Sequence, residues 1–180
     1  MQETYPGTTI EVARITKGSS QSLFDGVFAA GGLTLSQVSV MTGLEPYMIQ
    51  NWVKRGFVSS PVKRMYSRDQ FARIIIINML RDSLQIEKIC NVLDTLGGDP
   101  QKQFPAVIST SELYHLYFDM LAENAPLAFD GNEVAATAEK VAVCFNSNER
   151  LLSQILQLML YAHKASELRD KANQILYSLE

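Results

Sequence analysis

The sequence predicts a mainly α-helical protein in which a winged helix-turn-helix domain precedes an all-α C-terminal region with a long dimerisation-type helix. Three observations support this fold class. Apolar residues recur at three- and four-residue spacing through most of the 180 residues. Two short helical patterns meet at a Thr-Gly pair, which is the pattern of a helix-turn-helix. Neither proline nor glycine occurs in residues 133–179, which favours a long helix there.

Composition bounds the class of protein. The chain is 47% hydrophobic and 19% charged, so it has enough apolar residues to bury a core. It has no apolar run of the ~20 residues that a membrane span needs, and residues 1–7 lack the order of a signal peptide. We therefore expect a cytoplasmic protein without a membrane segment.

Charge is distributed unevenly along the chain. Its net charge is −3, which by itself argues against nucleic acid as a partner. Residues 54–88, however, contain eight basic and three acidic side chains, a local net charge of +5. A basic segment inside an acidic protein is typical of a localised phosphate-binding surface.

The first 32 residues predict an N-terminal arm and a short helix. Residues 1–17 fit either a short strand or an unstructured arm, and the pattern does not choose between them. Ser19 or Ser20 is expected to cap a helix that continues through Phe28. Gly31 and Gly32 then end it.

The helix-turn-helix follows directly. Thr34 is the expected N-cap of a first helix that ends at Thr42, and Gly43 supplies the left-handed backbone that the turn needs. Pro46 is suited to the first turn of a second helix that continues to Arg55. The apolar side chains that would pack the two helices together are Val38, Met41, Ile49, Trp52 and Val53.

A short wing and two further helices complete the first domain, residues 33–98. The wing, residues 62–66, follows Pro61 and carries two adjacent cations. Ser67 and Gln70 form a capping-box pattern at the start of a helix whose centre is Ile74–Ile77. That centre favours a strand by propensity, but the cap and its polar flanks favour a helix. A second amphipathic helix begins at Ile86 and ends at Gly97.

Residues 97–105 predict a linker to a second region, residues 106–180. Ser109 or Ser111 would cap its first helix, and residues 133–179 fit one helix or two with a break at 146–148. The apolar face of the last helix is too broad for one packing partner, so we expect a second copy to cover it. The alternative is a closed intramolecular bundle with the helix that starts at Ser109. The expected dimerisation residues are Leu152, Ile155, Leu156, Met159, Leu168, Ile175 and Leu176.

The order of helix, turn, helix, wing, helix and helix resembles the winged helix-turn-helix domain of MerR-type regulators. The matching residues are Thr42-Gly43, Trp52, Gly56-Phe57, Arg64-Met65-Tyr66-Ser67 and Ile86-Glu87-Lys88-Ile89. The run from Leu44 to Phe57 is more closely similar to an uncharacterised bacterial family, domain-of-unknown-function family 1836. The MerR resemblance implies a homodimeric transcriptional regulator that binds double-stranded DNA at a pseudo-palindromic site.

This resemblance implies a recognition helix, residues 46–55, in the major groove and the wing on the phosphates. MerR-type proteins typically have arginine where this chain has Tyr47 and Gln50, and tyrosine where it has Asn51. Amide side chains suit adenine, whereas arginine suits guanine. Tyr66 either contacts a phosphate or packs under the wing. The candidate DNA-binding residues are Ser36, Gln37, Tyr47, Gln50, Asn51, Lys54, Arg55, Lys63, Arg64, Tyr66 and Arg68.

No catalytic or metal-binding pattern occurs in the sequence, so we expect a protein that is not an enzyme and needs no cofactor. Cys90 and Cys144 lie far apart in helical patterns and are expected to be buried thiols. A small-molecule effector between the C-terminal helices is a further partner left open. The aromatic residues that would line its site are equally well explained as core: Tyr117, Phe118, Phe129 and Phe145.

The alternative function is a helical protein-interaction module on a MerR-like scaffold that no longer reads DNA. The absence of the arginines at Tyr47 and Gln50, together with the acidic remainder of the chain, favours it.

Overall fold

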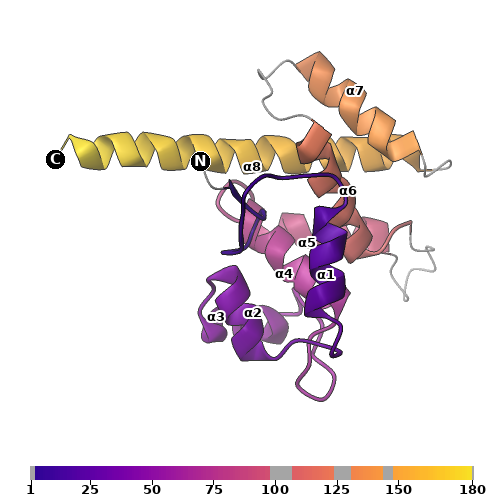
Figure 1. The fold of residues 1–180 in the computed structure, drawn as a ribbon, viewed down its shortest axis with the longest axis vertical. Coiled ribbons are helices and arrows are strands. Elements are labelled where there is room, and N and C mark those ends of the chain that lie inside the picture. Colours follow the sequence, from indigo (N-terminus) through magenta and orange to yellow (C-terminus); the bar gives the residue numbers. More distant parts are fainter. Residues whose placement is uncertain (1–2, 98–106, 124–130, 144–147, 180) are drawn as a thin grey trace.

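A computed structural model describes residues 3–97, 107–123, 131–143 and 148–179 (Figure 1). Within these ranges the protein is mainly α-helical, as predicted, with eight helices and one two-stranded antiparallel sheet. The strands are β1 (Glu3–Thr4) and β2 (Glu11–Val12), with Glu3 opposite Val12. The helices are α1 (Ser19–Val27), α2 (Leu35–Thr42), α3 (Pro46–Lys54), α4 (Arg68–Leu80), α5 (Ile86–Gly97), α6 (Thr110–Glu123), α7 (Gly131–Ala142) and α8 (Glu149–Ser178).

Helix α4 is the centre of the core. Its four consecutive isoleucines, Ile74–Ile77, are fully buried, so the stretch with strand propensity is a helix surrounded on all sides. One cluster of buried side chains extends from Phe24 in α1 to Ala162 in α8, and α4 packs against α5, α6 and α8. The predicted boundary between residues 33–98 and 106–180 therefore does not separate two cores. The residues between Gly97 and Val107 lie outside the described ranges.

The N-terminal segment forms the small sheet and is tied to the helices behind it. The Thr9 backbone N–H donates to the Met41 carbonyl at 2.9 Å, at the end of α2. The Asn78 side chain of α4 donates to the Gly7 carbonyl at 3.0 Å. The sequence left open whether this segment forms a strand or an arm, and the structure has a pair of strands. The loop between them is hydrogen-bonded to α2 and α4.

Gly7 is the tightest point of this segment, and we expect Gly7→Ala to be strongly destabilising. Its φ is +74°, and a Cβ added there would lie 2.2 Å from the Ile75 carbonyl oxygen. The clash and the backbone strain together should lower the free energy of unfolding by about 3 kcal/mol or more, measured by urea denaturation.

Gly26→Ala is the matched control for Gly7→Ala. Gly26 lies inside α1, and a Cβ there would meet nothing within 4 Å. This variant should gain roughly 0.5–1 kcal/mol, since alanine favours a helix over glycine. Equal effects of the two substitutions would contradict the close approach at Gly7.

The starts of α1 and α8 can be compared with the expectations from the sequence. Gly18, not Ser19 or Ser20, is the N-cap of α1. Ser20 is buried, and its hydroxyl pairs with His115 Nδ1 at 3.0 Å, so it serves packing between α1 and α6. The described part of residues 133–179 belongs to two helices, α7 and α8, and α8 begins after its N-cap Asn148 at the predicted break.

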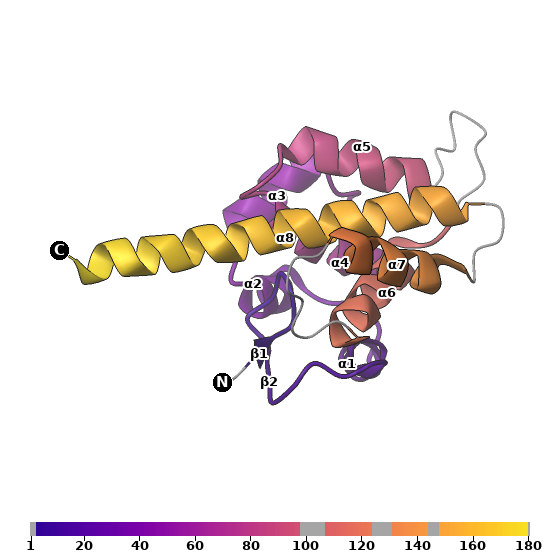
Figure 2. The same ribbon diagram turned by 90° about the horizontal axis from the view of Figure 1, so that it is seen from above.

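Helix α8 has a buried first half and an exposed second half. Side chains facing the core are buried as far as Ser166, and residues 168–179 are all exposed. Figure 2 shows this C-terminal part extending beyond the rest of the molecule. The first half closes the intramolecular bundle with α6 and α7, which was the alternative to dimerisation for this face.

His163 joins α8 to α6 where the last turns of α8 leave the body. The Tyr117 hydroxyl and His163 Nδ1 are 2.7 Å apart, and His163 Nε2 lies 3.6 Å from a Glu167 oxygen. Burial lowers the pKa of His163, although the Glu167 carboxylate opposes that effect.

This lowered pKa predicts that acid destabilises the fold. Below about pH 6.5 the unfolded chain binds a proton that buried His163 does not, so the free energy of unfolding falls as the pH drops through that value. His163→Gln should flatten part of the fall, measured as unfolding midpoints from about pH 7.5 to about pH 5.5. A variant with the full pH dependence would contradict it. The remainder is expected from His115, whose pKa is also lowered by burial.

Candidate nucleic-acid interface

The local chemistry of α2 and α3 fixes their relative position. Thr34 caps α2, and its side chain and that of Gln37 each accept from the other's backbone N–H. Gly43 ends α2 with a φ of 69°, the left-handed turn that the sequence predicts. Pro46 is the first residue of α3. Helices α2 and α3 therefore meet through a short turn with little freedom.

Four side chains form one exposed face of α3. Tyr47, Gln50, Asn51 and Lys54 follow the i, i+3, i+4, i+7 spacing of a single helix face. All four are exposed, and Tyr47 reaches 68% exposure. The opposite face carries Ile49 and Trp52 and is buried. Helix α3 is thus held by its apolar side and offers its amide, phenol and ammonium groups outward.

The wing is a narrow hairpin tied to the start of α2. Val62 bridges Met65, and Tyr66 exchanges two backbone hydrogen bonds with Leu33, of 2.7 and 2.9 Å. At its tip, Lys63 and Arg64 have φ values of 50° and 64°. Positive φ at both central residues is the requirement of the tight hairpin turn that favours Asn-Gly. Two exposed cations are therefore held in a backbone shape that their side chains disfavour.

The predicted DNA-binding cations fall into two groups. Arg55 is paired with Glu87 of α5 at 2.6 Å, and Arg68 is paired with Asp25 of α1 at 2.7 Å. Lys54, Lys63 and Arg64 form no ion pair with any residue of the described ranges. These three belong to the outer face of α3 and to the wing tip. Figure 1 shows α2, α3 and the wing at the end of the molecule away from α7.

Of three other predicted residues, two serve the scaffold and one is exposed. Tyr66 is 3% exposed, so of its two predicted roles the structure has the one under the wing, and burial raises its pKa. The side chain of Gln37 is engaged in the α2 cap. Ser36 is exposed in the first turn of α2.

The predicted dimerisation residues are also divided. Leu152, Ile155, Leu156 and Met159 are buried within the protomer, so they belong to its own core and not to a surface. The exposed members of the set are Leu168, Ile175 and Leu176.

Sequence reasoning found only part of a longer exposed seam on α8. Its members are spaced alternately by three and four residues, and all of them are exposed: Leu158, Tyr161, Ala165, Leu168, Ala172, Ile175 and Leu179. The heptad spacing was present in the sequence. It was hidden because the core-facing residues interleave with it and make the helix apolar over most of its circumference.

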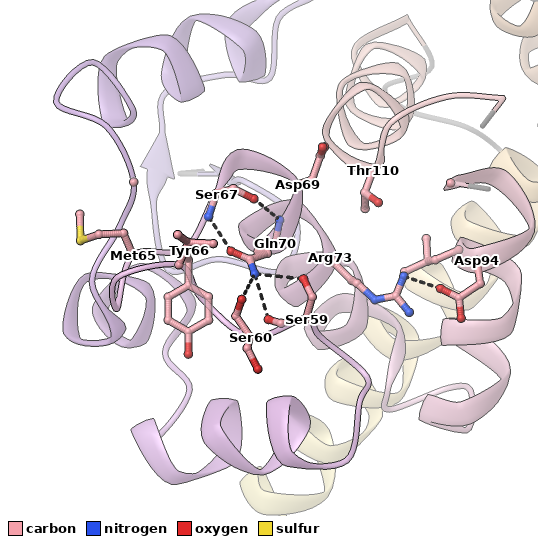
Figure 3. Close-up of a pocket in the computed structure, with 14 residues that line it drawn as sticks. Ser59, Ser60, Met65, Tyr66, Ser67, Asp69, Gln70, Arg73, Asp94 and Thr110 are labelled. Carbon is pink, nitrogen blue, oxygen red and sulfur yellow. Dashed lines mark hydrogen bonds and ion pairs between the residues drawn. The ribbon is translucent and has the colours of Figure 1, made fainter. Parts of the chain in front are cut away.

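A cavity of about 560 Å³ opens at the base of the wing (Figure 3). It lies where the wing base, the first turns of α4, the end of α5 and the start of α6 meet. Of the four aromatic residues named for an effector site between the C-terminal helices, Tyr117 and Phe118 are fully buried core residues. Phe129 and Phe145 lie outside the described residues.

The described residues contain no group of three or more His, Cys, Asp or Glu side chains that could hold a metal ion. Cys90 is buried, and burial raises its pKa, whereas Cys144 lies outside the described ranges. No helix of the described chain is long and apolar enough to cross a membrane.

Comparison with known proteins identifies a family for the region that contains α2, α3 and the wing. A family model described as a domain of unknown function, DUF1836, matches residues 27–117, about half of the chain. The match runs from the last residue of α1 into α6 and includes α2, α3, the wing, α4 and α5. No curated protein and no solved structure matches the chain.

Proposed function

Because the chain belongs to the DUF1836 family, a domain of unknown function, we propose its function from its own residues. It is a homodimeric, sequence-specific DNA-binding transcriptional regulator of MerR-like type. One observation carries this proposal. On α3 and the wing, three cations have no ion-pair partner among the described residues: Lys54, Lys63 and Arg64. Unpaired basic side chains on a protruding hairpin are suited to phosphate contact.

In the proposed complex, α3 lies in the major groove of double-stranded DNA. Its exposed face offers Gln50 and Asn51 to base edges, and paired amide donors and acceptors match adenine. Lys54 lies one turn beyond, toward the phosphates. The tip of the wing then contacts the flanking backbone through Lys63 and Arg64, and these contacts give affinity without sequence preference.

The second copy pairs through the seam on α8. The seam covers three heptads and lies on the face opposite the buried side chains of that helix, so a partner helix can lie along it without displacing the core. Two protomers related by a two-fold axis would then place two α3 helices on a pseudo-palindromic site.

The volumes of the seam residues favour an antiparallel pair. With the two helices centred on Ser166 and Glu167, Tyr161 of one copy faces position 172 of the other, an alanine, and Ala165 faces a leucine. Large residues then fill the space beside small ones. In a parallel pair each alanine would face its own copy and leave a void.

The experiment that tests the DNA-binding proposal is a titration of random-sequence duplex DNA with the purified protein over a series of salt concentrations, followed by fluorescence anisotropy. Three phosphate contacts per protomer, six per dimer, predict that log K falls with log salt at a slope of about −5. Absent binding at low salt would overturn the proposal. A steep slope would justify selecting for a specific site.

A second candidate, the helical protein-interaction module, is favoured by Tyr47 and Gln50 in the places where MerR-type proteins have arginine. In that function the α8 seam binds a different protein. Protein that is monomeric and indifferent to DNA, yet forms a stoichiometric complex with a purified partner through the seam, would decide for it.

A further inference from the structure

The cavity at the wing base has walls of mixed chemistry. Asp69, Gln70 and Arg73 line it from α4, and Figure 3 shows Gln70 beside Ser59 and Ser60 and Arg73 directed toward Asp94. Asp94 of α5 and Thr110 of α6 complete the opposite wall. The volume, about 560 Å³, is within the range of sites that take small molecules.

The charge of the lining is negative once its internal pairs are counted. Arg73 is the cationic side chain of the wall, and its guanidinium is already engaged: Nη1 lies 2.8 Å from an Asp94 oxygen, and Nε donates to the Phe57 carbonyl. Asp69 has no cation within 4 Å among the described residues. One of its oxygens accepts from the backbone N–H and the hydroxyl of Ser111, at 2.9 and 2.7 Å. The carboxylate of Asp69 therefore carries the surplus charge.

The remaining lining separates into a polar and an apolar side. The Gln70 amide is fully used within the protein, since it donates to Ser59 and Ser60 and accepts from the Ser67 backbone. The hydroxyls of Ser60 and Thr110 remain as polar groups of the wall. Met65 and Leu93 give the cavity an apolar surface. An anion would face two carboxylates here, whereas a cation with an apolar body matches both sides.

We propose that this cavity binds a small organic amine, whose ammonium donates to the Asp69 carboxylate while its apolar body lies against Met65 and Leu93. Charge-assisted hydrogen bonds to a carboxylate are the strong contacts available to such a ligand. The site is separate from the DNA-facing side chains of α3 and the wing tip, so the proposal goes beyond the proposed function and does not depend on it.

The test is isothermal titration calorimetry of the full chain without DNA, using two probes that share an apolar body: phenethylamine, a cation, and 3-phenylpropionate, an anion. The amine should bind one site per chain, and the anion should not. Asp69→Asn keeps the oxygen that accepts from Ser111 but removes the charge, so it should weaken binding of the amine about tenfold. Ser60→Trp, at an exposed position of the wall, should block binding by filling the cavity.

Glu45→Gln is the matched control, since it removes an exposed carboxylate outside the cavity, and it should leave the affinity for the amine unchanged. Three results would overturn the proposal: no binding of the amine, equal binding of the two probes, or equal losses in Asp69→Asn and Glu45→Gln. Since no DNA is present, the outcome is independent of the salt titration.

Discussion

Replacing Lys63 and Arg64 with asparagine and glycine is expected to stabilise the protein and weaken its binding to DNA at the same time. Asparagine and glycine are the residues preferred at positive φ in such a turn, so relief of the strained backbone should add about 1 kcal/mol to the free energy of unfolding. Loss of two phosphate contacts should reduce the salt slope by about 2 per protomer. Urea denaturation and anisotropy titrations measure the two effects separately.

Two control variants separate charge from strain. Lys63→Ala with Arg64→Ala removes the same charges but leaves both residues at positive φ, so it should weaken DNA binding without the gain in stability. Arg14→Ala with Arg150→Ala removes two exposed cations from other parts of the chain and should leave the salt slope nearly unchanged. If the two alanine pairs lowered the slope equally, the wing would have no special role in binding.

Introducing lysine at two positions of the α8 seam is expected to separate the dimer into folded monomers. Leu168 and Ile175 are 55% and 63% exposed in the protomer, so lysines there cost the monomer little. In the paired helices they would place four charges in an apolar seam, and the dimer dissociation constant should rise more than about 100-fold. Sedimentation equilibrium measures the constant, and circular dichroism reports whether the monomer remains helical.

Leu156→Ala is the contrasting substitution on the same helix. Leu156 is fully buried, so its truncation should lower the free energy of unfolding by roughly 2–5 kcal/mol. It should leave the dimer dissociation constant unchanged under conditions where the protein is folded. If the dimer persisted with the two lysines but was lost with Leu156→Ala, the interface would lie on the other face of α8.

The orientation of the pair can be tested by disulfide cross-linking. Cysteines at both Tyr161 and Ala172 would cross-link two copies in either arrangement, so a cross-link that forms with the pair but with neither cysteine alone identifies the antiparallel one. A single cysteine at Tyr161 would cross-link only in a parallel one.

The elements around α2 and α4 could be predicted from the sequence because their determinants are local. Thr34 and Ser67 cap helices with the side chain three residues later, and both capping boxes are present. Gly43 takes the left-handed conformation that the turn requires. Such signals depend on backbone groups within four residues, so no tertiary information is needed to recognise them.

The state of the charged residues could not be predicted in this way. Arg68 is neutralised by Asp25, 43 residues away, and Arg55 by Glu87, 32 residues away. A sequence gives the composition of a basic segment but not which cations find partners across the fold. The same limit applies to α8, where two apolar faces of one helix, one buried and one exposed, merge into a single broad pattern.

The exposed end of α8 has a consequence for amide hydrogen exchange. Residues 168–178 are helical but pack against nothing in the described protomer beyond the first of these turns. Helical turns without tertiary contacts open readily, so in dilute solution their amides should exchange far faster than those of the core. Pairing of two copies would slow the exchange of these amides by a factor set by the free energy of association. The exchange rate of these last turns should therefore depend on protomer concentration, because that concentration sets the fraction of chains that are paired. The exchange rate of the α4 amides should depend only on the stability of the core.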